Sequence, residues 1–244
     1  MKTGVKAAIG ATLVLILAVG GELIYLHHER NKPMAVVNAP VRERIADDDL
    51  VFLKHKRQSS MADAKELVGT TVWVSAGGQL DYYPYAGHAA NYGKAAGTLL
   101  GAEPLVVKDF VEQVAPKSAT VRIPGGDKQV LMVFTKPNET KLYAVPMGYR
   151  QAGEYTFYAD EILFYDDPHE LYKHWGPEIW KAVDDHTVIM GMNERQVELS
   201  LGQVSKSGSK DYGNRTVEFA NLGKPMAVTF VKNKVTDFRP DPSY

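Results

Sequence analysis

The sequence predicts an α+β protein with an N-terminal membrane helix, a β-rich domain and a C-terminal domain of two helices and three antiparallel strands. Three observations carry this prediction: a long apolar run near the N-terminus, β-branched segments separated by Gly and Pro, and a helical period followed by further strands. The predicted boundaries are 1–27 for the membrane segment, 28–65 for a tether, 66–166 for the β-rich domain and 167–244 for the C-terminal domain.

The membrane segment rests on residues 7–26, an apolar run interrupted only by Glu22. At 1.5 Å per residue, a helix of about 20 residues is about 30 Å long, which matches the hydrocarbon core of a bilayer. A cleaved signal peptide is the alternative, with Ala18-Val19-Gly20 as its cleavage site. We favour an uncleaved anchor because the apolar run continues past that site. In either case we expect the rest of the chain outside the cytoplasm, on the periplasmic side of the inner membrane.

The composition excludes several classes of protein. The chain has no Cys, which excludes disulfides, thiolate catalysis, Cys-ligated zinc and a lipid-modified N-terminal Cys. A net charge of −1 gives no general attraction to nucleic acid, so no nucleic-acid partner is expected. Within the predicted tether, an acidic group at 47–49 precedes a basic group at 54–57, which is typical of a solvated linker.

The β-rich domain is predicted to start near Leu67, with a strand that ends at Val74. A helix is predicted over 105–114, because the apolar residues of this segment approximate one helical face. A meander of four antiparallel strands follows, with a hairpin turn at 124–127 and the option of closing into a small SH3-like barrel. These strands are predicted at 119–123, 128–135, 141–149 and 153–164.

The first helix of the C-terminal domain has a clear start signal. Asp167 is suited to cap it, and Pro168 occupies the first helical position. Leu171, Trp175, Ile179 and Val183 then recur at every fourth position, which predicts one apolar stripe over three turns.

The second helix of this domain carries the sharpest local pattern in the chain. Asn193 and Gln196 have the spacing of a capping box, and Met192 and Val197 have the spacing of a hydrophobic staple around it. Gly202 is suited to end the helix in a left-handed conformation. The structural motif comprises Asp167, Gly191, Met192, Asn193, Gln196, Val197, Leu201 and Gly202. Strands are predicted to follow at 216–220, 226–231 and 235–238.

This pattern of glycine, methionine, glutamine and valine, followed by Leu201-Gly202, resembles the SmpA/OmlA (BamE-like) family over residues 172–240. The resemblance implies a two-helix, three-strand fold and a non-enzymatic role as an accessory subunit in envelope assembly, with envelope proteins as partners. The chain departs from the family in lacking the lipobox Cys, and Gln203 stands where the family usually has Pro. No binding residue transfers, because the matched positions are structural.

The best candidate for a ligand surface in the β-rich domain is a stretch rich in tyrosine and glycine. Exposed tyrosines are able to stack on sugar rings or hold a peptide, whereas packing within the sheet is the commoner role of such residues. The sequence therefore leaves a carbohydrate-binding protein as the alternative to a protein-interaction module. The candidate ligand-binding residues are Tyr82, Tyr83, Tyr85 and Tyr92.

A second group of residues has the chemistry of a metal site but not its spacing. His169 and His174 are five apart, about 140° around a helix, so they are unable to share one metal ion. Glu170 and His174 do share a face, but a surface pair explains them as well. We therefore predict no metal, no cofactor and no enzymatic activity, and a metal-assisted hydrolase around Asp166–His186 is the third hypothesis.

Overall fold

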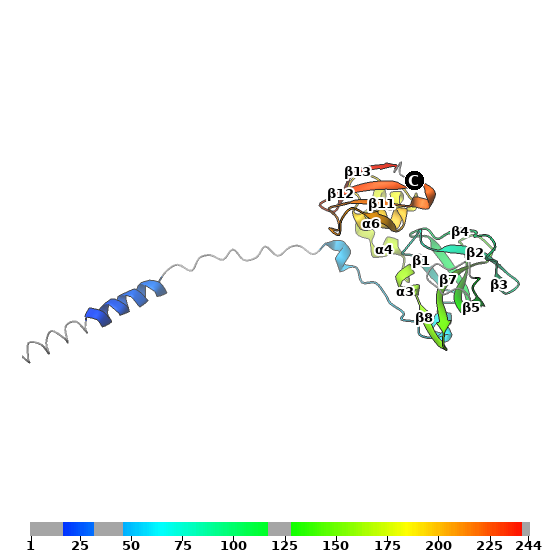
Figure 1. The fold of residues 1–244 in the computed structure, drawn as a ribbon, viewed down its shortest axis with the longest axis horizontal. Helices are drawn as coiled ribbons and strands as arrows, with labels where there is room; N and C mark the ends of the chain where they lie inside the picture. The colour runs from blue at the N-terminus through cyan, green and yellow to red at the C-terminus, as the bar shows by residue number, and fades with distance from the viewer. Residues whose placement is uncertain (1–16, 32–45, 117–127, 241–244) are drawn as a thin grey trace, which may run out of the picture. The chain divides into compact units, whose positions relative to one another are not determined.

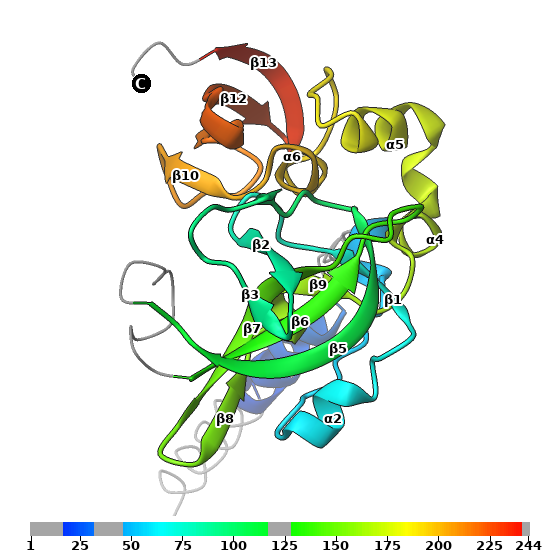
Figure 2. The same ribbon diagram turned by 90° about the vertical axis from the view of Figure 1, so that its right-hand side faces the viewer.

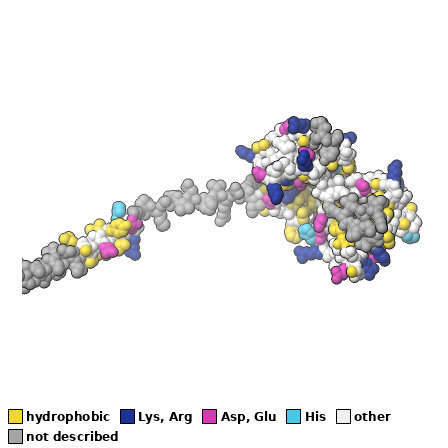
Figure 3. Space-filling model, viewed as in Figure 1, with side chains coloured by type: hydrophobic (Ala, Val, Ile, Leu, Met, Phe, Trp, Pro, Cys, Tyr) yellow, Lys and Arg dark blue, Asp and Glu magenta, His cyan; other side chains and the backbone are white. Residues whose placement is uncertain are grey.

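The computed structural model of the chain describes residues 17–31, 46–116 and 128–240. It divides into two compact units, Met1–Ile45 and Ala46–Tyr244 (Figure 1). In the first unit, residues 17–30 are helical, and their apolar side chains are exposed, as Figure 3 shows in yellow. The predicted membrane span at 7–26 begins outside the described residues. Of the helices in the part of the chain that the structure describes, none is both long and apolar enough to cross a bilayer.

The second unit is an α+β fold, as predicted, with a nine-stranded and a four-stranded antiparallel sheet. The large sheet has the order β3-β2-β7-β6-β5-β1-β9, with β4 paired to β2 and β8 to β7, and Figure 2 shows its strong curvature. Among the described strands no pairing joins β3 to β9, so the sheet is an open path and not a closed barrel. The strands are β1 (Thr71–Val74), β2 (Asp81–Ala86), β3 (Ala89–Ala90), β4 (Gly97–Thr98), β5 (Pro104–Val114), β6 (Lys128–Thr135), β7 (Tyr143–Gln151), β8 (Glu154–Phe157) and β9 (Leu163–Phe164).

The predicted meander is confirmed for β6, β7 and β8, which follow one another along the chain and pair antiparallel. The strand predicted at 119–123 and the turn predicted at 124–127 lie outside the described residues. The predicted strand at 153–164 is shorter, since the short helix α3 (Ala159–Ile162) separates β8 from β9.

The helix predicted over 105–114 is wrong, because this segment is the long strand β5, paired with both β1 and β6. Its pairing with β6 shifts register between Val107 and Asp109, which indicates a β-bulge. The buried side chains of Leu105, Val107 and Phe110 are therefore spaced by two and then by three residues. This change of spacing imitated a helical period in the sequence, although the β-branched residues of the segment suit a strand.

Two apolar clusters cover the two faces of the large sheet. The larger one includes Phe110 and Phe134 and is closed by α2 (Met61–Lys65) and α3. The smaller one contains Leu131 and Ala144 on the opposite face. Strand β6 is buried on both sides for this reason, and we call this sheet with its helices the β-rich lobe.

The C-terminal lobe has its own core, formed where helices pack on the smaller sheet of order β10-β11-β12-β13. The three predicted strands are confirmed, and the sequence did not indicate the fourth, β10. Its elements are α4 (Pro168–Leu171), the 3-10 helix η2 (Lys173–Trp175), α5 (Pro177–Asp184), α6 (Glu194–Leu201), β10 (Val204–Ser207), β11 (Thr216–Phe219), η3 (Asn221–Gly223), β12 (Met226–Val231) and β13 (Lys234–Pro240).

The single helix predicted from Pro168 is instead three short segments. The cap is confirmed, because the Asp167 carboxylate accepts the His169 backbone N–H at 2.9 Å. The helix is interrupted first at Tyr172 and again at Gly176, which has a φ of +80° and precedes Pro177. The residue before a proline avoids the helical region, and the positive φ turns the chain before α5 begins.

The folded unit begins at Ala46 and not near Leu67, so residues 46–65 of the predicted tether at 28–65 belong to this unit. We call residues 46–57 the strap; it contains the 3-10 helix η1 (Asp47–Leu50) and runs in extended form toward α2. Val51 and Leu53 pack on the C-terminal core, and the backbone N–H groups of Lys56 and Arg57 donate to Asp160 at 2.9 Å. Two of the charged side chains that suggested a solvated linker, Asp48 and Lys54, also form contacts within the fold, with His174 and Asp166 respectively.

The end of α6 lies very close to the backbone of the β-rich lobe. A Cβ at Gly101 would lie 1.9 Å from the Leu199 carbonyl oxygen, and one at Gly202 would lie 2.7 Å from the Gly77 carbonyl oxygen. No side chain fits at such distances. These glycines therefore permit the contact that holds α6 against the β-rich lobe.

Candidate functional site

The capping motif of α6 is present as predicted. The Asn193 side-chain oxygen accepts the Gln196 backbone N–H at 2.9 Å, and the Asn193 N–H donates to the Gln196 side chain at 2.7 Å. Met192 and Val197 are fully buried beside this box, in agreement with the predicted staple. Gly202 has a φ of +90° and a ψ of −159°, so its φ is positive but its conformation is not the predicted left-handed helical one.

The start of α6 binds the strap through Asp48. One carboxylate oxygen of Asp48 accepts the Trp175 indole N–H at 2.6 Å and lies 2.6 Å from His174 Nε2. The other oxygen accepts the Asn193 side-chain amide at 2.7 Å. Burial raises the pKa of Asp48, but these hydrogen bonds outweigh burial and lower it overall, so the carboxylate is ionised at neutral pH. The positive end of the α6 dipole favours the same charge.

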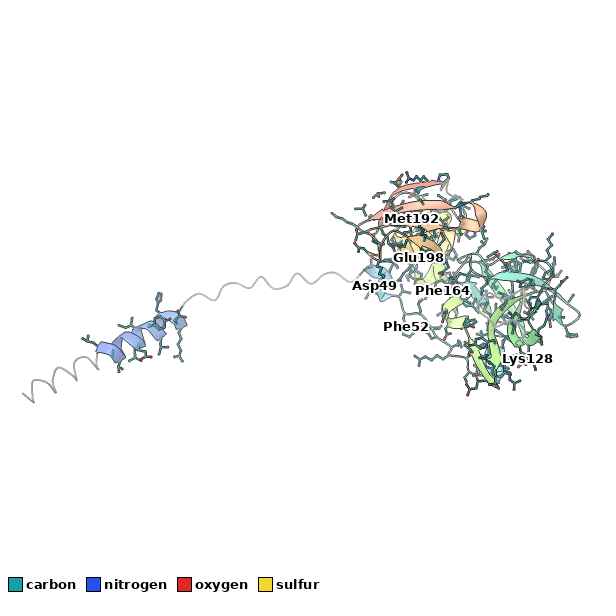
Figure 4. The ribbon with its side chains drawn as sticks, in the orientation of Figure 1. Asp49, Phe52, Lys128, Phe164, Met192 and Glu198 are labelled. Atoms are coloured by element: carbon teal, nitrogen blue, oxygen red, sulfur yellow. The ribbon has the colours of Figure 1, made fainter. Side chains whose placement is uncertain are left out.

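Arg195 lies beside this contact and holds the strap by its backbone. Its guanidinium donates to the Asp48 carbonyl oxygen at 3.2 Å and lies 3.8 Å from the Asp49 carboxylate. Figure 4 shows Asp49 on the strap next to the lobe that carries Met192 and Glu198. The Arg195 side chain is still 43% exposed, so it remains accessible to a ligand.

Two cavities meet at Trp175 and Arg195, which line both of them. The first, of about 410 Å³, lies along the strap and is also lined by His174, Asn193, Tyr212 and Asn233. The second, of about 280 Å³, reaches the β-rich lobe at Ser75 and Phe164, and its wall also includes Leu53, Tyr172, Glu198, Leu199 and Gln203. We call the two cavities together the Arg195 groove. It combines aromatic walls with charged groups of both signs.

Glu198 supplies a carboxyl group to this groove whose charge changes near neutral pH. Burial, followed by the negative charge of Glu194, raises the pKa of Glu198 to about 7, although Arg195 and Arg215 act in the opposite direction. A carboxyl group with such a pKa is able to donate or accept a hydrogen bond at pH 7.

A buried ion pair supports the wall of the groove that carries Tyr212. Glu194 is fully buried and accepts two hydrogen bonds from the Arg215 guanidinium, at 2.6 and 2.8 Å. The same carboxylate accepts the Gly213 backbone N–H at 2.7 Å, which fixes the loop that carries Tyr212. The Arg215 guanidinium lies 5.4 Å from the centre of the Tyr212 ring, within the range of a cation–π contact.

The four predicted tyrosines do not gather on one surface. Tyr82 is buried in the main core, where its ring contacts Phe134 and Tyr143 edge to face. Tyr83 and Tyr92 lie on the opposite face with ring centres 4.9 Å apart, and Tyr85 packs beside them. This division follows from the alternation of side chains along β2.

The residues weighed as a metal site are also dispersed. His169 lies between Asp167 and Asp184 and stacks on Trp180, whereas His174 is bound to Asp48. His186 lies 3.1 Å from the Ser200 carbonyl oxygen. Within the described ranges, no group of three or more His, Cys, Asp or Glu side chains is placed to hold a metal ion.

Asp48, Arg195, Glu198 and Tyr212 are among the groove residues that the sequence did not indicate. Asp48 is separated from Trp175 by 127 positions, so no local spacing connects them. Arg195 and Glu198 flank the motif residues of α6 and had no separate signal. Comparison of the chain with protein-family models, with curated proteins and with solved structures found no match. The resemblance to the SmpA/OmlA family therefore stays a prediction.

Proposed function

We propose that this protein is a membrane-anchored, extracytoplasmic module that binds other proteins of the cell envelope, and that the Arg195 groove is its binding site. The observation that carries the proposal is the position of Trp175, Arg195 and Tyr212 along one groove. Tryptophan, tyrosine and arginine supply most of the energetic centres of protein interfaces, because they combine a large contact area with hydrogen bonding.

The groove is also well fixed before any partner arrives. The capping box holds the start of α6, the glycine contacts hold its end, and the buried Glu194–Arg215 pair holds the Tyr212 loop. A preformed site loses little conformational entropy when a ligand binds. The same groove already holds a segment of peptide, the strap, through Asp48 and its backbone carbonyl.

The anchoring part of the proposal rests on the apolar run at 7–26 and on the exposed apolar side chains within it. Leu17, Leu23 and Ile24 are each more than 60% exposed in the helix of residues 17–30. A bilayer would remove such side chains from water at a gain of about 1.5–3 kcal/mol each.

Site-directed photo-crosslinking in native membranes tests the proposal. A photoreactive amino acid at Tyr212, which is 48% exposed in the groove, is expected to crosslink to envelope proteins. The matched control is the same amino acid at Leu222, which is 56% exposed and does not line the groove. The Tyr212 crosslinks should disappear when Arg195 is changed to Ala.

Identical crosslinks from Tyr212 and Leu222, or crosslinks that survive Arg195→Ala, would show that the groove is not the binding site. Capture of wall glycan in place of protein would favour the carbohydrate-binding alternative.

A further inference from the structure

The strap lies on the C-terminal lobe in the manner of a bound peptide. The polar contacts at Asp48 run to residues more than 120 positions away along the chain, on η2 and at the start of α6. At these contacts Asp48 contributes its carboxylate and its backbone carbonyl, and every donor comes from the lobe. Val51 and Leu53 then pack on the C-terminal core. The strap residues that contact the lobe therefore form a short sequence pattern: an aspartate, with aliphatic residues three and five positions after it.

The carboxylate of Asp48 occupies a built site. Trp175 is itself buried, and its indole N–H points at the carboxylate. The Asn193 amide and the His174 ring lie on the same carboxylate, at the positive end of α6. Hydrogen bonds to a charged acceptor are stronger and shorter than those between neutral groups. This set of donors selects a carboxylate over a neutral side chain.

Apart from the Asp48 side chain, which is 14% exposed, the strap covers this site shallowly. None of the residues of η1 is buried, and Leu50 and Phe52 are 65% and 82% exposed. Beside the strap, the cavity of about 410 Å³ continues toward Tyr212 and Asn233. A second peptide has room to contact this cavity while the strap is still bound, and then to replace Asp48, Val51 and Leu53 of the strap.

We propose that the Asp48 site is a receptor for an acidic peptide segment of a partner protein, and that the strap is its resident ligand in the free protein. The inference rests on the proposed function and names its ligand class: an extended segment with an aspartate followed by two aliphatic residues in the spacing of Asp48, Val51 and Leu53. The partner's aspartate takes the Trp175, His174 and Asn193 donors, and its aliphatic residues take the places of Val51 and Leu53.

The strap competes at high effective concentration, because it belongs to the same chain. Wild-type protein is therefore expected to bind a free peptide weakly. Loss of the Asp48 carboxylate should weaken the strap and make the site available. A change at Asp49 should not weaken the strap, because this carboxylate is 62% exposed and its ion pair with Arg195 is long at 3.8 Å.

The test uses the full chain in detergent and a fluorescent peptide with the sequence of residues 46–54. Binding by fluorescence anisotropy should be at least about tenfold tighter for Asp48→Ala than for wild type, while Asp49→Ala should match wild type. Adding Trp175→Phe to Asp48→Ala leaves a smaller aromatic ring without the N–H, and should reverse most of the gain in peptide affinity. A peptide with Asn in place of its second aspartate should not bind.

Folding of each variant is checked by circular dichroism, and Asp48→Asn, which preserves the shape of the side chain, replaces Asp48→Ala if the latter unfolds. A folded Asp48 variant that does not bind the peptide, or an equal gain from Asp49→Ala, would overturn the inference. Crosslinks at Tyr212 that depend on Arg195 would then still support the proposed function, so the two failures are distinguishable.

Discussion

Asn193 uses its side-chain amide twice, with its oxygen accepting the Gln196 N–H at 2.9 Å and its nitrogen donating to Asp48 at 2.7 Å. The residue that starts α6 is therefore also the residue that binds the strap. The two roles connect the local fold of the motif to a segment 145 positions earlier in the chain. A change at this position acts on the helix, on the strap or on both, depending on the side chain introduced.

The two roles of Asn193 are separable by substitution. Asn193→Ser keeps an N-cap oxygen but loses the donor to Asp48, which should cost about 1.5–3 kcal/mol as a hydrogen bond to a charged group. Asn193→Ala loses the cap as well, at a further cost of about 1 kcal/mol. The free energy of unfolding measured in urea should therefore be highest for wild type, lower for Asn193→Ser and lowest for Asn193→Ala. Equal stability of the Ser variant and wild type would mean that the strap contact contributes nothing.

The motif around Asn193 shows how much the sequence was able to predict. Its capping box and staple depend on residues within five positions of one another, so the pattern was readable from the chain alone. Strand β5 was misread because a bulge changed the spacing of its buried residues. Both the correct prediction of the motif and the wrong prediction of β5 depended on the local spacing of residues.

The candidate site was not predictable in the same way, because its members come from distant segments. Asp48 and Trp175 meet only after the strap has packed on the C-terminal lobe, and nothing in their spacing predicts the contact. The raised pKa of Glu198 likewise depends on burial among residues that the fold brings together. Tyr82 and Tyr83 are adjacent in sequence, yet the strand places them on opposite faces.

The buried pair of Glu194 and Arg215 is expected to be essential for stability. Arg215→Ala would leave the fully buried Glu194 carboxylate without its guanidinium partner, at an expected cost of about 3–5 kcal/mol. Chemical unfolding measures this cost. Lys206→Ala is the matched control, since Lys206 forms an exposed pair with Glu218 at 3.2 Å and should cost less than about 1 kcal/mol. Similar costs for both variants would contradict the buried role of the first pair.

Glu198 should make the protein less stable as the pH rises toward 7. Its pKa is raised from an ordinary 4.5 to about 7, so the folded state keeps a proton that the unfolded state releases. The stabilising effect is complete below pH 4.5 and is lost as the pH passes through about 7. Glu198→Gln should therefore raise the free energy of unfolding at pH 8 by about 1–2 kcal/mol. It should also make this free energy depend less on pH between 4.5 and about 7. An unchanged profile would show that the carboxyl group is not perturbed by folding.

His169 should also make the protein less stable as the pH rises, because of its two carboxylate partners. Burial lowers the pKa of His169, but hydrogen bonds to Asp167 and Asp184 outweigh burial and raise it overall. The stability gained from the charged ring is complete below the unfolded pKa and is lost as the pH rises through the folded pKa. Nuclear magnetic resonance titration of the ring should give a pKa above about 6.5, and Asp184→Asn should lower it. A pKa at or below that value would contradict the two contacts.

The proposed location of the folded unit is testable because the chain contains no Cys. A single Cys at Leu222, which is 56% exposed, should react with a membrane-impermeant maleimide in intact cells whose outer membrane has been made permeable. A Cys at the fully buried Ala144 is the control, and should react only after denaturation. Labelling at Leu222 that requires lysis of the inner membrane would place the groove in the cytoplasm. That result would exclude envelope partners, because the groove and its strap would then face a different set of proteins.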